Sequence, residues 1–153
     1  MPFDLDLCGI ALTFEVQKFK TPPLEEQFSK WCNVDFRIRS GNWLNYHIDG
    51  ELMMPGDIQM ILTYIDALLD SGVAEPFHYE CTEPDFQFTF HPKKDLRNDP
   101  RHIYIAPGHE IEDIELEWSV YFWNGRLPGN RLTLVLRRKE IIALQQYLKS
   151  VAE

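Results

Sequence analysis

Alternation with a period of two residues is the dominant pattern of this chain. In the stretch EDIELEWSVYFWNG, from Glu112 to Gly125, every second residue from Ile114 to Phe122 is apolar. Side chains of a β-strand point alternately to opposite faces, so the apolar set predicts a buried strand face. That set is Ile114, Leu116, Trp118, Val120 and Phe122. The outward set is Glu115, Glu117, Ser119, Tyr121 and Trp123.

The same alternation recurs along most of the chain, and two segments follow helical spacing instead. The further predicted strands are GIALTFEVQKF, NVDFRIRS, WLNYHID, FHYECT, FQFTF, HIYIA and RLTLVLRR. Apolar residues spaced by three and four predict amphipathic helices in MPGDIQMILTYIDALLDSG and KEIIALQQYLKSVAE. Pro55 suits the first turn of the earlier helix, and Gly72 suits its end.

These elements predict an α+β fold. Short connections between neighbouring strands make most pairings antiparallel. Two helices about 10 Å wide cannot cover about eight strands spaced about 4.8 Å apart, so the sheet has to curl. We therefore expect a single domain over residues 1–153, with a strongly bent, mostly antiparallel sheet of about eight strands and two amphipathic helices packed on it.

Charge and cysteine usage restrict the partners and the compartment. The net charge of −9 argues against binding to nucleic acid or to an anionic membrane, and it favours a basic partner. The cysteines, Cys8, Cys32 and Cys81, form no C-x-x-C motif, so we expect free thiols in a reducing compartment. Asp4 and Asp6 make the N-terminus a poor signal peptide, and no apolar run reaches the roughly 18 residues of a membrane span. We expect a cytoplasmic protein.

No motif in the sequence predicts catalysis or a cofactor. Four histidines fall on outward strand positions and could converge on a metal, but their spacing matches no established site, so we expect no metal. Cys81, close to His78, is a possible nucleophile, yet its strand parity places it inward, where a thiol is usually inert. We expect a protein that is not an enzyme. The histidines are His47, His78, His91, His102 and His109, of which His109 lies outside the strands.

The outward strand positions favour a binding surface. Five acidic residues fall between Glu110 and Glu117, and large aromatics lie on the same outward positions. Charged runs usually only solvate an edge, but Trp and Tyr are common binding anchors, and a charged rim selects the partner. Such a face suits a basic protein, for instance a nuclease. The predicted contact residues are Trp43, Tyr104, Glu110, Glu112, Asp113, Glu115, Glu117, Tyr121 and Trp123, with Glu15, Asp35 and Asn45 also outward.

The order of several segments resembles the WapI-type immunity proteins of bacterial polymorphic toxin systems. These segments are ALTFEVQKF with the Pro22–Pro23 break, WCNVDFRIRSGNW, the helix after ELMMPGD, TEPDFQFTFHP, ELEWSVYFW and LVLRRKEIIALQQYL. The resemblance runs from about Ile10 to the last helix. It implies a non-catalytic protein that blocks a cognate toxin in the cytoplasm of the producing cell. The loop HPKKDLRNDP is a possible departure from the family.

Two alternatives stay open at the level of the sequence. One is a small enzyme or ligand-binding domain with a pocket inside the curled sheet, lined by Tyr46, Phe86, Phe88 and Trp118. The other is a general protein–protein interaction module without a toxin partner. A large secreted protein with a variable C-terminal domain, encoded directly upstream, would favour the immunity function over both.

Overall fold

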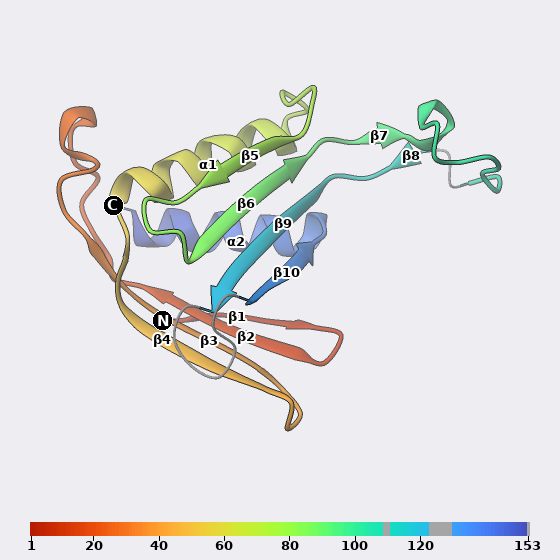
Figure 1. Ribbon diagram of the computed structural model, residues 1–153. Helices are drawn as coiled ribbons and strands as arrows, with labels where there is room; N and C mark the ends of the chain where they lie inside the picture. Colours follow the sequence, from red (N-terminus) through yellow and green to blue (C-terminus); the bar gives the residue numbers. More distant parts are fainter. Residues whose placement is uncertain (109–110, 123–129, 153) are drawn as a thin grey trace.

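The computed structural model describes residues 1–108, 111–122 and 130–152 (Figure 1). Two four-stranded antiparallel sheets and two helices form the body of the molecule, and a two-stranded arm projects from it. The α+β class and the predominantly antiparallel pairing are confirmed. The predicted bend takes the form of a division into two sheets, and the strands do not close into a barrel.

The first sheet has the strand order β1-β2-β3-β4. Its strands are β1 (Phe3–Leu7), β2 (Ile10–Val16), β3 (Cys32–Ser40) and β4 (Leu44–Met53). Strand β1 was not predicted from the sequence. It pairs with β2 through a two-residue turn in which Cys8 and Gly9 both have positive φ, and the Gly9 amide donates to Asp6. Such a turn matches the twist of a hairpin.

The second sheet has the order β10-β9-β6-β5. Its strands are β5 (Phe77–Glu80), β6 (Phe86–His91), β9 (Glu115–Phe122) and β10 (Asn130–Leu136). Burial alternates strictly along β9, with Leu116, Trp118, Val120 and Phe122 buried. The predicted inward face of this strand is therefore confirmed.

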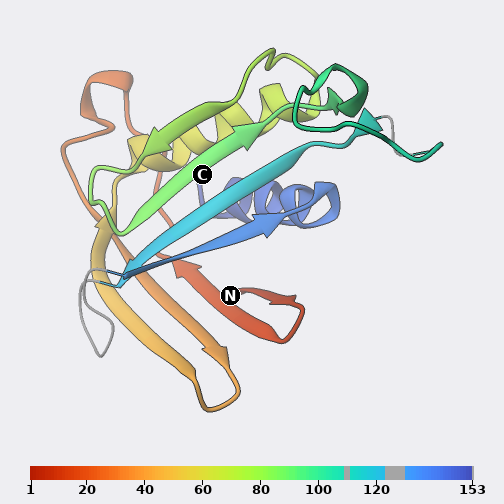
Figure 2. The same cartoon turned by 45° about the vertical axis from the view of Figure 1, so that its right-hand side comes forward.

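Both helices lie against one face of the second sheet (Figures 1 and 2). Helix α1 (Pro55–Leu69) contacts β6, and α2 (Arg138–Val151) contacts β9 and β10. Their predicted apolar stripes are buried, and α1 ends where the Gly72 amide donates to the Ala67 carbonyl at 2.7 Å. Among the described residues, no helix is long and apolar enough to cross a membrane.

The two sheets share one core, and aromatic rings join them. Phe14 of β2 lies 5.0 Å from Trp118 of β9, and Phe36 of β3 lies 5.2 Å from Phe86 of β6, measured between ring centroids. All four side chains are almost completely buried. The inner faces of both sheets are thus used for packing, and the outward faces remain for solvent or for a partner.

The prediction of a strand at HIYIA, residues 102–106, is wrong. This segment lies in the loop of the arm, which contains β7 (Lys94–Asp95), a short helical turn (Leu96–Asn98) and β8 (Ile111–Glu112). Figure 1 shows the arm extending the β6 and β9 strands beyond the helices. An ion-pair cluster orders the loop, since Lys94 and Arg101 lie 2.8 and 2.7 Å from the Asp99 carboxylate. Alternating apolar residues did not form a strand here because they lack a core to face.

We expect Trp118→Ala to lower the free energy of unfolding by about 3–5 kcal/mol, because it opens a cavity where the two sheets meet. Trp43→Ala is the matched control, since Trp43 is 66% exposed in the β3–β4 turn. Its effect should stay within about 0.5 kcal/mol. Urea unfolding followed by circular dichroism measures both. Equal destabilisation by the two substitutions would contradict the placement of Trp118 at the centre of the core.

Candidate functional site

The predicted stripe on β9 lies on the outward face of the second sheet, but basic side chains accompany it. Glu115 forms an ion pair with Arg137, and only 18% of its side chain is exposed. The Glu117 carboxylate lies 3.4 Å from His91 Nε2 on β6. The Tyr121 hydroxyl accepts a hydrogen bond from Arg131 at 3.1 Å. The stripe is therefore a surface of mixed charge, in which each predicted acid has a cationic or titratable neighbour.

The remaining predicted contact residues do not converge on this stripe. Trp43 lies in the β3–β4 turn and Tyr104 in the arm, and both are strongly exposed. Figure 1 shows the β3–β4 turn and the arm well separated on the molecule. Glu110 and Trp123 lie outside the described residues. Glu112 belongs to β8 by its backbone, and the position of its side chain is not among those described.

Asp113 fixes the base of the arm to the start of α2. Its carboxylate accepts hydrogen bonds from Arg138 Nη2 at 2.8 Å and Nε at 3.0 Å. Hydrogen bonding to Arg138 and to the Ile114 amide lowers the pKa of Asp113 from 3.8 to about 2. Because the folded chain holds this pKa below its ordinary value, the pair contributes to stability above pH 3.8 and loses that contribution as the pH falls towards 2.

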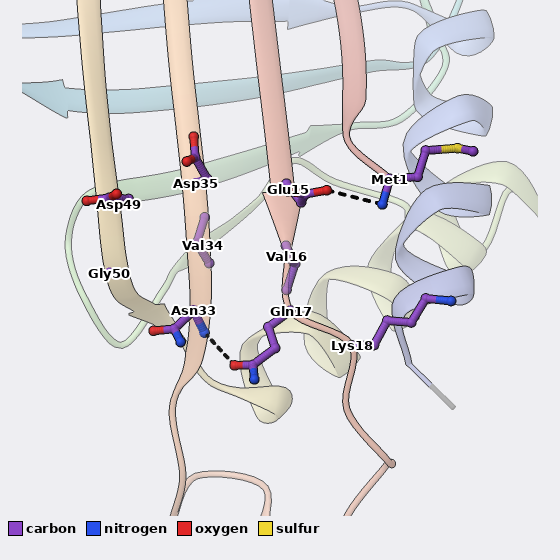
Figure 3. Close-up of a pocket in the computed structure, with 10 residues that line it drawn as sticks. All are labelled: Met1, Glu15, Val16, Gln17, Lys18, Asn33, Val34, Asp35, Asp49 and Gly50. Carbon is purple, nitrogen blue, oxygen red and sulfur yellow. Dashed lines mark hydrogen bonds and ion pairs between the residues drawn. The ribbon is translucent and has the colours of Figure 1, made fainter.

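A row of three carboxylates crosses the outward face of the first sheet. Glu15 on β2 is directly opposite Asp35 on β3, and Asp35 is directly opposite Asp49 on β4. Figure 3 shows the three side chains on neighbouring strands. We call these three residues the acidic row. Strand parity had placed Glu15 and Asp35 outward, but the row depends on the pairing register, which a single sequence does not give.

The acidic row borders a depression of about 650 Å³, whose wall also includes Gln17, Lys18 and Asn33 (Figure 3). Its charges are only partly balanced. The N-terminal amine lies 3.1 Å from Glu15, and Asp35 has Arg37 at 3.6 Å and His47 at 3.2 Å. Like charges directly opposite each other on paired strands are destabilising. The arrangement therefore lowers stability and leaves negative charge on an open surface.

The same face holds the set of potential metal ligands that the structure brings together among its described residues. One ligand atom each from Asp35, His47 and Asp49 lies within 4.8 Å of the others. The convergence of outward histidines that the sequence left open is not found among the described residues, because His47 is on the first sheet while His78 and His91 are on the second. Each of these three histidines lies beside a carboxylate instead.

The aromatic residues of the alternative pocket fill the core. Phe88 lies 5.3 Å from Trp118, and Tyr46 lies 4.7 Å from Phe122, measured between ring centroids. Tyr46, Phe86, Phe88 and Trp118 are all buried. These side chains pack against one another and against their neighbours. They therefore form part of the core between the two sheets.

The residues near Cys81, the possible nucleophile, are arranged around the buried carboxylate of Asp57. This carboxylate accepts hydrogen bonds from the Tyr79 hydroxyl at 2.7 Å, the Thr82 amide at 3.1 Å and the Met54 amide at 2.9 Å. The negative charge stays inside the protein because these donors satisfy it. Burial, hydrogen bonding and the charge of Asp57 raise the pKa of Tyr79 far above its ordinary value. Asp57 thus ties the start of α1 to β5 and the turn after it.

The thiols next to this carboxylate are poor nucleophiles. Burial, with a smaller effect from Asp57, raises the pKa of Cys32 to about 11, and burial also raises the pKa of Cys81 well above its ordinary value. A thiolate is the reactive form of cysteine, so both groups stay unreactive near neutral pH. The described residues around Cys81 therefore form a structural cluster.

We expect native protein at pH 8 to react with iodoacetamide quickly at Cys8 and slowly at Cys32 and Cys81. Cys8 is exposed, whereas the other two thiols are buried and protonated at this pH. All three should react quickly in denaturant. Mass spectrometry of the alkylated protein measures both states. Fast modification of Cys81 in the native protein would contradict its structural role, and a disulfide would contradict the expected free thiols.

The comparison with known proteins agrees with the resemblance seen in the sequence. A model of the Immunity protein WapI-like family matches residues 6–153 of the chain. None of the curated proteins compared with the chain matches it. Membership of this family suggests immunity against a toxin and implies binding of a cognate toxin in general, by proteins that are generally non-catalytic. The chain belongs to the Immunity protein WapI-like family.

Proposed function

We propose that this protein binds and neutralises a cognate toxin domain in the cytoplasm, without catalysis of its own, and that the toxin is a basic, nuclease-type protein. Family membership supports the immunity function. The acidic row supports the chemical nature of the partner. Nucleases carry basic surfaces because they hold phosphates, and an acidic face on another protein can occupy such a surface.

The acidic row is the observation that carries the proposal. It puts three carboxylates on adjacent strands, where they repel one another. A basic partner would relieve that repulsion on binding. The net charge of −9 adds a long-range field that speeds the approach of such a partner.

The charge on the first sheet distinguishes it from the second. Besides the acidic row, its outward positions carry the acids Asp4, Asp6 and Glu51 and the bases Arg37, Arg39 and His47. On the second sheet, Arg137 and His91 lie beside the two predicted acids of β9. The first sheet therefore fits a basic partner better. The β9 stripe of Glu115, Glu117 and Tyr121, together with Trp123, stays a prediction as the alternative contact surface.

We expect Asp49→Asn to slow association with the toxin domain and to make it less dependent on salt, while dissociation changes little. Removing one charge from the acidic row weakens the attraction between separated partners. Stability should be kept or slightly raised, by about 0.2–1 kcal/mol, because repulsion within the row falls. Surface-plasmon kinetics at two salt concentrations, with the inactivated toxin domain encoded directly upstream, measure the rates.

The matched control is Glu115→Gln, which also removes one negative charge but from the mixed surface of β9. It should leave association close to that of the parent. If this control slows association and Asp49→Asn does not, the β9 stripe is the contact surface and the acidic row is only solvated. If the parent protein neither binds the toxin domain nor protects cells that express it, the proposed function is wrong.

A further inference from the structure

The connection between β2 and β3, residues 17–31, projects from the first sheet where α1 begins (Figures 1 and 2). Two hydrogen bonds close its base: the Gln17 amide donates to the Asn33 carbonyl at 2.9 Å, and the Asn33 amide donates to Gln17 Oε1 at 3.3 Å. A third joins its far side to the body of the molecule, since the Gly56 amide of α1 donates to the Gln27 carbonyl at 2.8 Å. The connection is therefore held at both its base and its far side.

Phe28 and Gly56 form a fitted contact that positions this connection. A Cβ atom at Gly56 would lie 2.4–2.7 Å from carbon atoms of the Phe28 ring. Such a distance is far inside normal van der Waals contact, so the ring sits where any other residue would place its side chain. Glycine near the start of α1 thus allows the connection to lie directly on the helix backbone.

The tip held in this way leaves an apolar side chain in solvent. Leu24 begins the short helical turn Leu24–Glu26, and it is 82% exposed, while Glu25 and Glu26 are exposed beside it. Pro22 and Pro23 precede the turn and restrict its backbone before any partner arrives. Ordering a segment in advance reduces the entropy that is lost on binding. An ordered tip therefore presents the uncovered Leu24 side chain to a partner at a reduced entropic cost.

The connection leaves the first sheet at the end of the acidic row, since Gln17 and Lys18 line the same depression as Glu15. Its lysines, Lys18, Lys20 and Lys30, fall outside the helical turn, whereas Glu25 and Glu26 follow Leu24 directly and place two exposed carboxylates beside it. A basic protein with an apolar recess would therefore match both features together. A second copy of this chain, with a charge of −9, is a poor match because acidic surfaces would face each other.

We propose that Leu24, presented by the Phe28–Gly56 contact, is the apolar anchor that enters a recess of the basic toxin domain and sets its residence time. This inference rests on the proposed function and assigns it a second contact beside the acidic row. The acidic row determines the rate at which the toxin associates, and the tip determines the rate at which it dissociates. The two features are therefore separable by kinetics.

The first test is Leu24→Ser, with the inactivated upstream-encoded toxin domain as the probe. We expect dissociation to become at least about tenfold faster, with association nearly unchanged, because a central apolar anchor acts on the bound state. Ile103→Ser is the matched control, since Ile103 is fully exposed in the arm. Its kinetics should equal those of the parent. Circular dichroism and the unfolding midpoint should be unchanged in both variants, since both side chains are exposed.

The second test changes the position of the tip without changing Leu24. Gly56→Ala should speed dissociation of the toxin, because the new methyl group displaces the Phe28 ring. Adding Phe28→Ala removes the collision, so the double variant should regain the unfolding midpoint lost by Gly56→Ala. It should not regain the affinity, because the tip has lost its contact with the helix. Recovery of both quantities would show that positioning by Phe28 is irrelevant to binding.

The outcomes separate this inference from the proposed function. If Leu24→Ser binds like the parent while Asp49→Asn still slows association, the inference is overturned and the immunity function stands. Faster dissociation of Ile103→Ser alone would place the anchor in the arm and overturn the inference as well. A parent protein that dimerises through Leu24 in sedimentation experiments would assign the tip to a second copy. Failure of the parent to bind the toxin domain would remove the proposed function itself.

Discussion

The packing of Trp118 against Phe14 and Phe86 is the contact on which the rest of the structure depends. Phe14 belongs to the first sheet, whereas Trp118 and Phe86 belong to the second, so the burial of these rings fixes how the two sheets meet and which faces remain outside. The indole N–H of Trp118 has no hydrogen-bond acceptor among the described residues, so ring packing must outweigh an unpaired buried donor. The open outward faces are a consequence of this joint, because each sheet has only one face committed to the core.

The buried carboxylate of Asp57 connects the core to the proposed contact region. By accepting hydrogen bonds from Met54, Tyr79 and Thr82, it holds the first turn of α1 against the second sheet. Gly56 directly precedes Asp57, and the Phe28 ring packs against the Gly56 backbone. The position of the exposed tip is therefore set by a charge inside the protein. Removal of that charge would disturb the tip as well as the helix.

Sequence periodicity predicted what depends on local alternation and missed what depends on pairing. The inward position of Trp118 and the stripe of α1 follow from spacing alone, and both are found. The residues 102–106 alternate equally well, yet they form a loop because a strand needs a neighbour and a core. Strand β1 was missed although Phe3, Leu5 and Leu7 alternate with Asp4 and Asp6, and in the structure this short segment pairs with β2. The acidic row needed the register of three strands, which no single strand contains.

The same reasoning explains why the acids of β9 and those of the first sheet differ as evidence for a surface that binds a basic partner. Glu115 and Glu117 form a negative stripe along β9 by spacing alone, but Arg137, which follows β10, and His91 of β6 lie beside them. On the first sheet, Glu15 and Asp49 are each directly opposite another carboxylate, Asp35, and the N-terminal amine, Arg37 and His47 balance this charge only in part. Charge on a sheet is thus a property of rows across strands rather than of positions along one strand. Like charges that face one another across strands lower stability, and a basic partner that binds the row would supply a compensating attraction.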